Sequence, residues 1–177
     1  VRNGYELWKD QVNAKGGIEV GGQKLPVQLI YYDDQSDNQT AAKLTEKLIT
    51  EDKVQFLLGP YGSGPTFATT AIAEKYDIIT IANLAHATNI SDRGFQNAYP
   101  VLAPGTWLFY SFIDLLAAQT PRPSKVAIIY PNDNFPASVA KGAESRAKEN
   151  GFEVVYIEEY PKGVKDLSST ILKIKSS

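Results

Sequence analysis

Short runs of β-branched and other apolar residues recur along the chain at nearly regular intervals, and this rhythm restricts the fold more than any other feature. Each run begins 20 to 28 residues after the previous one. That interval fits one strand, one crossover helix and the loops between them. The sequence therefore predicts an α/β fold with doubly wound, mainly parallel sheets. The expected strands are 27–32, 54–58, 78–81, 98–101, 125–130 and 153–157.

Helical patterns lie between most of these runs, and most carry a start or stop signal. Tyr5, Trp8 and Val12 share one face of the first expected helix, and Gly16 and Gly17 supply its end. Two more expected helices begin after a cap at Asp37 and near Pro65. A strongly apolar segment, 107–118, follows Pro104, and the last expected helices span 137–150, stopped by Gly151, and 166–175.

The rhythm breaks near residue 103. The interval between Ile81 and Ala98 lacks a strong helical face, and Pro104 and Gly105 follow the weak strand that comes next. The part of the chain beyond this break offers only two clear strands, so we expect its lobe to be partial. The expected lobes are residues 1–103, lacking a first strand, and residues 104–177.

Composition removes several classes of chemistry. The chain has no cysteine and one histidine, which excludes thiolate nucleophiles, iron–sulfur clusters and cysteine-based zinc sites. The formal net charge of -2 gives no electrostatic reason to expect a nucleic-acid partner. No run approaches the roughly 20 apolar residues of a membrane helix. Because methionine is absent and the chain opens within a helical pattern, we expect a processed or trimmed product.

Ligands of open α/β sheets bind beyond the carboxyl ends of the strands, so the strand–helix junctions are the candidate sites. The first junction contains Asp33 and Asp34. Paired acids at a strand end hold Mg²⁺ in receiver-type phosphotransfer domains, but the further acidic and Lys residues of such a site are missing. A turn followed by a helix cap at Asp37 is the favoured interpretation, and no metal site is predicted.

The second junction is the glycine-rich segment Tyr61-Gly62-Ser63-Gly64. It lacks the Lys of a phosphate-binding loop. Ser63 and Gly64 are expected at the N-terminus of a helix, where free N–H groups and the helix dipole favour a carboxylate. The alternative, equally supported by the residues, is that Ser63 merely caps the helix.

Two further junctions contain candidate ligand contacts. The first runs through His86, Ala87 and Thr88, and its carbonyl and hydroxyl groups suit hydrogen bonding to an amino or amide group. No nucleophile has a recognisable setting near His86, so a catalytic role is not expected. In the second, Phe135 either closes over a ligand or packs as a helix staple.

Read together, these junctions resemble the type I periplasmic solute-binding proteins of the branched-chain amino acid and amide ABC transporters. The resemblance extends over nearly the whole chain, and it rests on the order and spacing of its motifs. They are Asn3-Gly4, Val12-Asn13-Ala14-Lys15-Gly16-Gly17-Ile18, Tyr32-Asp33-Asp34-Gln35-Ser36-Asp37, Leu58-Gly59-Pro60-Tyr61-Gly62-Ser63-Gly64, Ala87-Thr88-Asn89, Arg93-Gly94-Phe95, Tyr160-Pro161 and Asp166-Leu167-Ser168.

The resemblance implies a non-enzymatic, exported receptor without a cofactor. Its two lobes would close over a small amino acid, amide or related carboxylate in the periplasm or outside the cell, for delivery to an ABC permease. By position, Ser63 and the neighbouring N–H groups would hold the ligand carboxylate, and Ala87 and Thr88 with His86 would hold its ammonium. The ligand-binding residues expected in this way are Tyr61, Gly62, Ser63, Gly64, His86, Ala87, Thr88 and Phe135.

The chain also departs from the family pattern. Members often show Ser-Ala-Thr where this chain has Ala85-His86-Ala87-Thr88. The resemblance further implies a strand and an aromatic ligand contact before Val1, and an acidic residue for the ammonium after Ser177. Two alternatives stay open: a ligand-sensing domain of the same fold in a receptor or regulator, and a flavodoxin- or receiver-type enzyme with a metal at Asp33 and Asp34.

Overall fold

The computed structural model describes all residues from Val1 to Ser177. Its contacts divide the chain into two compact units, an N-terminal unit, Val1–Gln35, and a main unit, Ser36–Ser177. The two parallel sheets both belong to the main unit, one before residue 103 and one after it. The lobe boundary near residue 103 stays a prediction.

The N-terminal unit consists of helix α1 (Arg2–Ala14) and an antiparallel hairpin of β1 (Ile18–Val20) and β2 (Gln23–Leu25). Gly17 has a φ of 101°, and a Cβ there would fall 1.9 Å from the carbonyl oxygen of Leu25, so only glycine fits this turn. The helix end at the glycine pair is therefore confirmed. The hairpin was not predicted.

The strand expected at 27–32 is wrong, because this segment joins no hydrogen-bonded ladder. At its start, the side chain of Asn13 replaces a neighbouring strand. Its Nδ2 donates to the carbonyl of Val27 at 2.9 Å, and the N–H of Val27 donates to Oδ1 at 2.7 Å. A side-chain amide thus satisfies both backbone groups of Val27.

The first sheet of the main unit is parallel, with the order β3–β4–β5. Its strands pair over only two or three residues, so they are shorter than the predicted runs. Asp37 caps the helix that precedes the sheet by accepting from the N–H of Thr40 at 2.7 Å, which confirms the predicted cap. The elements are α2 (Asn38–Thr50), β3 (Leu57–Leu58), α3 (Ser63–Lys75), β4 (Thr80–Ala82), the short 3₁₀ helix η1 (Thr88–Ile90) and β5 (Ala98–Pro100).

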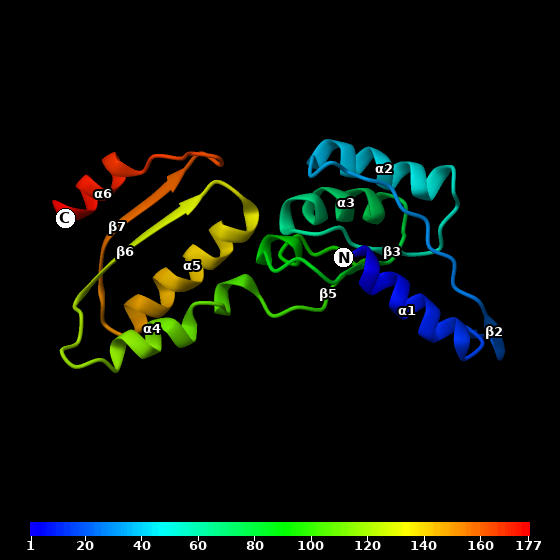
Figure 1. Ribbon diagram of the computed structural model, residues 1–177, viewed down its shortest axis with the longest axis horizontal. Coiled ribbons are helices and arrows are strands. Elements are labelled where there is room, and N and C mark those ends of the chain that lie inside the picture. Colours follow the sequence, from blue (N-terminus) through cyan, green and yellow to red (C-terminus); the bar gives the residue numbers. More distant parts are fainter. The chain divides into compact units, whose positions relative to one another are not determined.

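Helices α2 and α3 pack against each other (Figure 1). Their contact encloses a core of Ile49, Leu57 and Ala73. Because Leu57 belongs to β3, this core joins both helices to the first sheet.

The second sheet is also parallel and contains two strands, β6 and β7. Helix α5 packs on this sheet and contacts α4, whereas α6 lies on the other side of β7 (Figure 1). The core here is Ile113, Ala147 and Phe152. The elements are the 3₁₀ helix η2 (Gly105–Trp107), α4 (Tyr110–Ala117), β6 (Lys125–Pro131), α5 (Asn134–Glu149), β7 (Glu153–Tyr160) and α6 (Ser168–Lys175).

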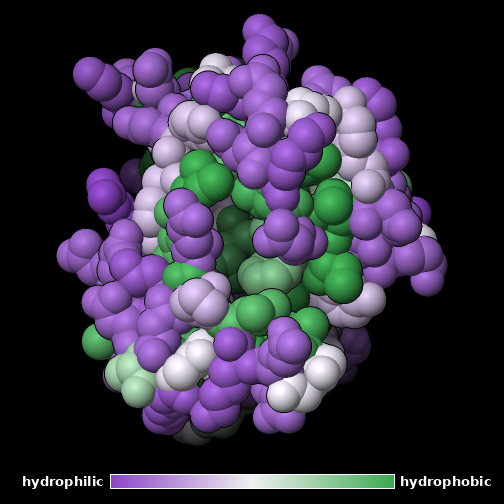
Figure 2. Space-filling model, turned by 90° about the vertical axis from the view of Figure 1, so that its right-hand side faces the viewer, coloured by the Kyte–Doolittle hydropathy of each residue, from purple (hydrophilic) through white to green (hydrophobic).

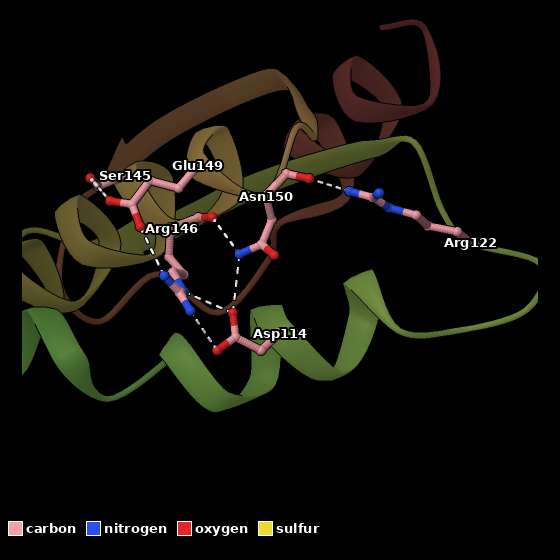
Figure 3. Close-up of polar contacts among 6 residues, drawn as sticks. All are labelled: Asp114, Arg122, Ser145, Arg146, Glu149 and Asn150. Carbon is pink, nitrogen blue, oxygen red and sulfur yellow. Dashed lines mark hydrogen bonds and ion pairs between the residues drawn. The ribbon is translucent and has the colours of Figure 1, made fainter.

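A polar network joins α4 to α5 (Figure 3). Arg146 binds Asp114 with two hydrogen bonds, from Nε to Oδ1 at 2.7 Å and from Nη2 to Oδ2 at 2.8 Å. Asn150 Nδ2 donates to the same carboxylate at 3.0 Å, and Arg146 Nη1 donates to Glu149 at 3.0 Å. This bidentate ion pair joins α4 to α5 by two parallel hydrogen bonds.

Asp114 should make the stability of the protein depend on pH. The hydrogen bond from Arg146 lowers the pKa of Asp114, so its stabilising effect is complete above about pH 4 and is lost as the pH falls through the lowered pKa. We expect Asp114→Asn to lower the denaturation midpoint at pH 7, and the difference from the wild type to shrink progressively below about pH 4. Urea unfolding at a series of pH values measures this, and an equal difference at all pH values would contradict it.

The surface has a face on which hydrophobic residues gather within a border of hydrophilic ones (Figure 2). Exposed large hydrophobic side chains occur beside the first sheet, at Phe56, Ile79, Tyr99 and Val101, and along η2 and α4. None of the helices combines the length and the apolar character that crossing a bilayer requires.

Candidate functional site

The candidate site is built around the first turn of α3. Gly62 stands at the N-cap with a φ of 92°, a conformation that favours glycine, and Ser63 is the first helical residue. The N–H of Gly62 donates to the carbonyl of Leu84 at 3.1 Å, and Thr66 Oγ1 donates to the carbonyl of Gly62 at 2.8 Å. The first bond holds the turn beside the loop that follows β4, and the second closes the first turn of α3.

Ser63 does not cap its helix, so that alternative is wrong. Its side chain is 3% exposed, and its Oγ accepts from the N–H groups of His86 and Ala87, both at 3.1 Å. A hydroxyl has two acceptor positions and one donor. Because both acceptor positions are occupied, only the O–H of Ser63 is left to act, and it can act only as a donor.

His86 connects the loop to the crossover between the two sheets. Its carbonyl accepts from the N–H of Gly105 at 2.6 Å, and its Nδ1 lies 2.8 Å from the carbonyl oxygen of Ala103. A carbonyl oxygen only accepts, so Nδ1 carries a proton here. The ring also packs against Phe135, with a centroid distance of 5.6 Å and a tilt of 42°. Phe135 is 38% exposed at the start of α5.

Thr88 is bound by a residue that sequence reasoning missed. Its N–H donates to Ser138 Oγ at 3.1 Å, and the two hydroxyl oxygens lie 3.4 Å apart. Ser138 lies inside α5 and is 7% exposed. A serine within a helical pattern carries no signal of such a contact, because the partner is 50 positions away in the sequence.

Gly64 occupies a narrow space. A Cβ at this position would lie 3.1 Å from Asn38 Oδ1 and 3.5 Å from Asp133 Oδ1. Asp133 caps α5 by accepting from the N–H of Asn134 at 2.8 Å, and Lys162 Nζ donates to its other oxygen at 2.6 Å. The lysine offsets the negative charge of Asp133 near the start of α3, where an anionic ligand would otherwise be repelled.

Arg93 binds the second half of the loop that follows β4 to helix α3. Its guanidinium lies 3.8 Å from the ring centroid of Phe67 and 4.3 Å from that of Phe95. It donates to the carbonyl of Phe67 at 2.9 Å and also to Thr70 Oγ1. Since Phe67 and Thr70 belong to α3, the loop is bound to one helix at both of its ends.

The structure therefore groups most of the predicted residues. Ser63, Ala87 and His86 share hydrogen bonds, and Phe135 contacts His86. Thr88 joins the group through Ser138. Gly62 and Gly64 flank Ser63 in the chain. Tyr61 stands apart, with a side chain that is 75% exposed. The ligand-binding role of all these residues stays a prediction.

The structure places Asp33 in a turn, where its Oδ1 accepts from the N–H of Gln35 at 2.9 Å. This is the turn interpretation of the first junction. No three carboxylate or imidazole groups come together in a way that would hold a metal ion.

Two solved structures with the same fold are described as a substrate-binding and a solute-binding protein of transporters. The branched-chain amino acid transporter substrate-binding protein LivJ from Streptococcus pneumoniae, in complex with isoleucine, is 26% identical and superimposes with a TM-score of 0.75, over 99% of this chain and 48% of that one. A solute-binding protein of an ABC transporter from R. palustris, in complex with 4-hydroxybenzoate, is 19% identical with a TM-score of 0.77, over 97% and 46%. The predicted type I periplasmic-binding-protein fold is confirmed.

The sequence gives the same assignment. The sequence pattern of the family described as periplasmic binding protein matches residues 1–177, so the chain belongs to that family. Leu/Ile/Val-binding protein homolog 7 of Brucella abortus (strain 2308) is 30% identical over 98% of this chain and 44% of its own length. The chain thus spans a little under half the length of these relatives, and the family resemblance drawn from the motifs is confirmed.

Proposed function

We propose that the protein that carries this chain is the solute-binding component of an ABC importer, located in the periplasm or on the outside of the cell. It captures a small amino acid or related carboxylate and presents it to a membrane permease. One observation supports the carboxylate above all: Ser63 has both acceptor positions of its hydroxyl occupied, at the first residue of a helix.

The donors at this point suit an anion. The O–H of Ser63 can only be given to an acceptor, and the N–H groups of Ser63 and Gly64 lie in the first helical turn, where no carbonyl precedes them in the helix. The helix dipole adds partial positive charge at the same place. A carboxylate uses all three features, whereas a neutral amide offers the same oxygen without the charge. The carboxylate is therefore favoured over the amide.

The relatives are consistent with this choice. Isoleucine and 4-hydroxybenzoate, which occupy the two solved structures, differ in size, aromaticity and the presence of an ammonium. The group that they share is a carboxylate. The common recognition element would therefore be the first turn of α3, and the remaining surroundings would set which carboxylate is preferred.

The proposal is tested by calorimetric titration of the intact protein with isoleucine, leucine and 4-hydroxybenzoate. The matched controls are isoleucinamide, leucinamide and methyl 4-hydroxybenzoate, which keep the shape of each ligand and remove the negative charge. We expect at least one carboxylate to bind and its neutral counterpart to bind about 10-fold more weakly or worse, as for a lost charged hydrogen bond. Equal binding of both members of a pair, or binding of none, would reject it.

A further inference from the structure

Three consecutive backbone N–H groups in the candidate site all donate to serine hydroxyls. Those of His86 and Ala87 donate to Ser63 on α3, and that of Thr88 donates to Ser138 on α5, each at 3.1 Å. Two helices from different parts of the chain thus share one tripeptide between them. A buried N–H needs an acceptor, so each serine fixes where its part of the loop can lie.

The position of Ser138 is itself closely defined. A Cβ on Gly105 would lie only 3.2 Å from Cβ of Ser138, and a Cβ on Gly142 would lie 1.8 Å from the carbonyl oxygen of Thr106. Helix α5 therefore contacts η2 closely at two points, at Ser138 and one helical turn later at Gly142. This packing leaves the helix little freedom to slide, and Ser138 Oγ is held at a fixed point beside Thr88.

We infer that Ser138 is a positioning residue of the ligand site. It holds the amide of Thr88, and with it the hydroxyl of Thr88, in place without touching the ligand. The inference rests on the proposed function, in which the loop His86–Thr88 contacts the bound solute. The inference adds that α5, which packs on the second sheet, influences how tightly the loop after β4 of the first sheet binds the ligand.

The test combines amide hydrogen exchange with ligand affinity in the intact protein. Ser138→Ala removes the acceptor and leaves a residue that favours helix. The matched control is Ser145→Ala on the same helix, where the exposed hydroxyl contacts only Glu149, at 3.2 Å. We expect Ser138→Ala to accelerate exchange of the Thr88 amide at least 10-fold and to weaken binding of isoleucine or 4-hydroxybenzoate about 10-fold. Ser145→Ala should change neither.

A merely structural role would accelerate exchange throughout α5 and lower the melting temperature, without a specific effect at Thr88. That result would overturn the inference, and so would faster exchange at Thr88 with unchanged affinity. In the second case the proposed function stands, because the wild-type protein still binds a carboxylate. If the wild-type protein binds none of the probes, the proposed function fails and the positioning role fails with it, while unchanged Thr88 exchange would refute the hydrogen bond separately.

Discussion

Replacing Gly142 by alanine is expected to destabilise the protein by about 3 kcal/mol. The new Cβ would lie 1.8 Å from the carbonyl oxygen of Thr106, about half of a normal contact distance. Both atoms belong to rigid backbone, so no side-chain rotation relieves the overlap and either α5 or η2 must move. Alanine favours the helix by up to about 1 kcal/mol over glycine, which is too little to offset the clash.

Gly4→Ala is the matched control, because it makes the same substitution in a helix with nothing within 4 Å of the new Cβ. We expect it to leave stability unchanged or to raise it by up to about 1 kcal/mol. Urea unfolding monitored by circular dichroism measures both variants. A Gly142→Ala protein as stable as the wild type would mean that α5 and η2 are not in close contact in solution.

The helices could be predicted because their signals are local. Asp37 precedes its helix by one position, and Gly151 follows shortly after the end of α5 with a φ of 76°. A cap or a left-handed turn depends on residues within one helical turn, all of which are visible in the sequence. The strand at 27–32 failed for the opposite reason. A strand needs a partner, and apolar alternation does not reveal that Asn13 would bind Val27 in place of one.

In the candidate site, too, features with a local signal could be predicted and contacts between distant residues could not. The glycines around Ser63 marked the turn, but the sequence left the role of its hydroxyl open between a cap and a ligand contact. The hydroxyl oxygen of Ser63 accepts from the N–H groups of His86 and Ala87, which lie more than 20 positions away in the sequence. Ser138 had no local signal at all. The contact between Ser138 and Thr88 depends on the packing of α5 on η2, and no sequence motif indicates this packing.

Replacing Ser63 by alanine should weaken carboxylate binding by about 10-fold to 100-fold, or about 1.4 to 2.8 kcal/mol. The substitution removes the O–H that we propose donates to the ligand, and it also leaves the N–H groups of His86 and Ala87 without an acceptor. Stability should fall by about 1 to 3 kcal/mol for the second reason. Calorimetric titration and urea unfolding of the intact protein measure the two effects.

The two effects of Ser63→Ala can be separated with ligand pairs. A disordered loop would weaken a carboxylate and its neutral counterpart by the same factor, whereas loss of the donor should weaken the carboxylate more, since hydrogen bonds to charged groups are the stronger ones. We therefore expect a coupling of about 1 kcal/mol between the substitution and the ligand charge. Ser91→Ala, an exposed serine in the same loop, should show no coupling. Equal losses for both ligands would leave Ser63 a structural role alone and would remove the main support for the carboxylate.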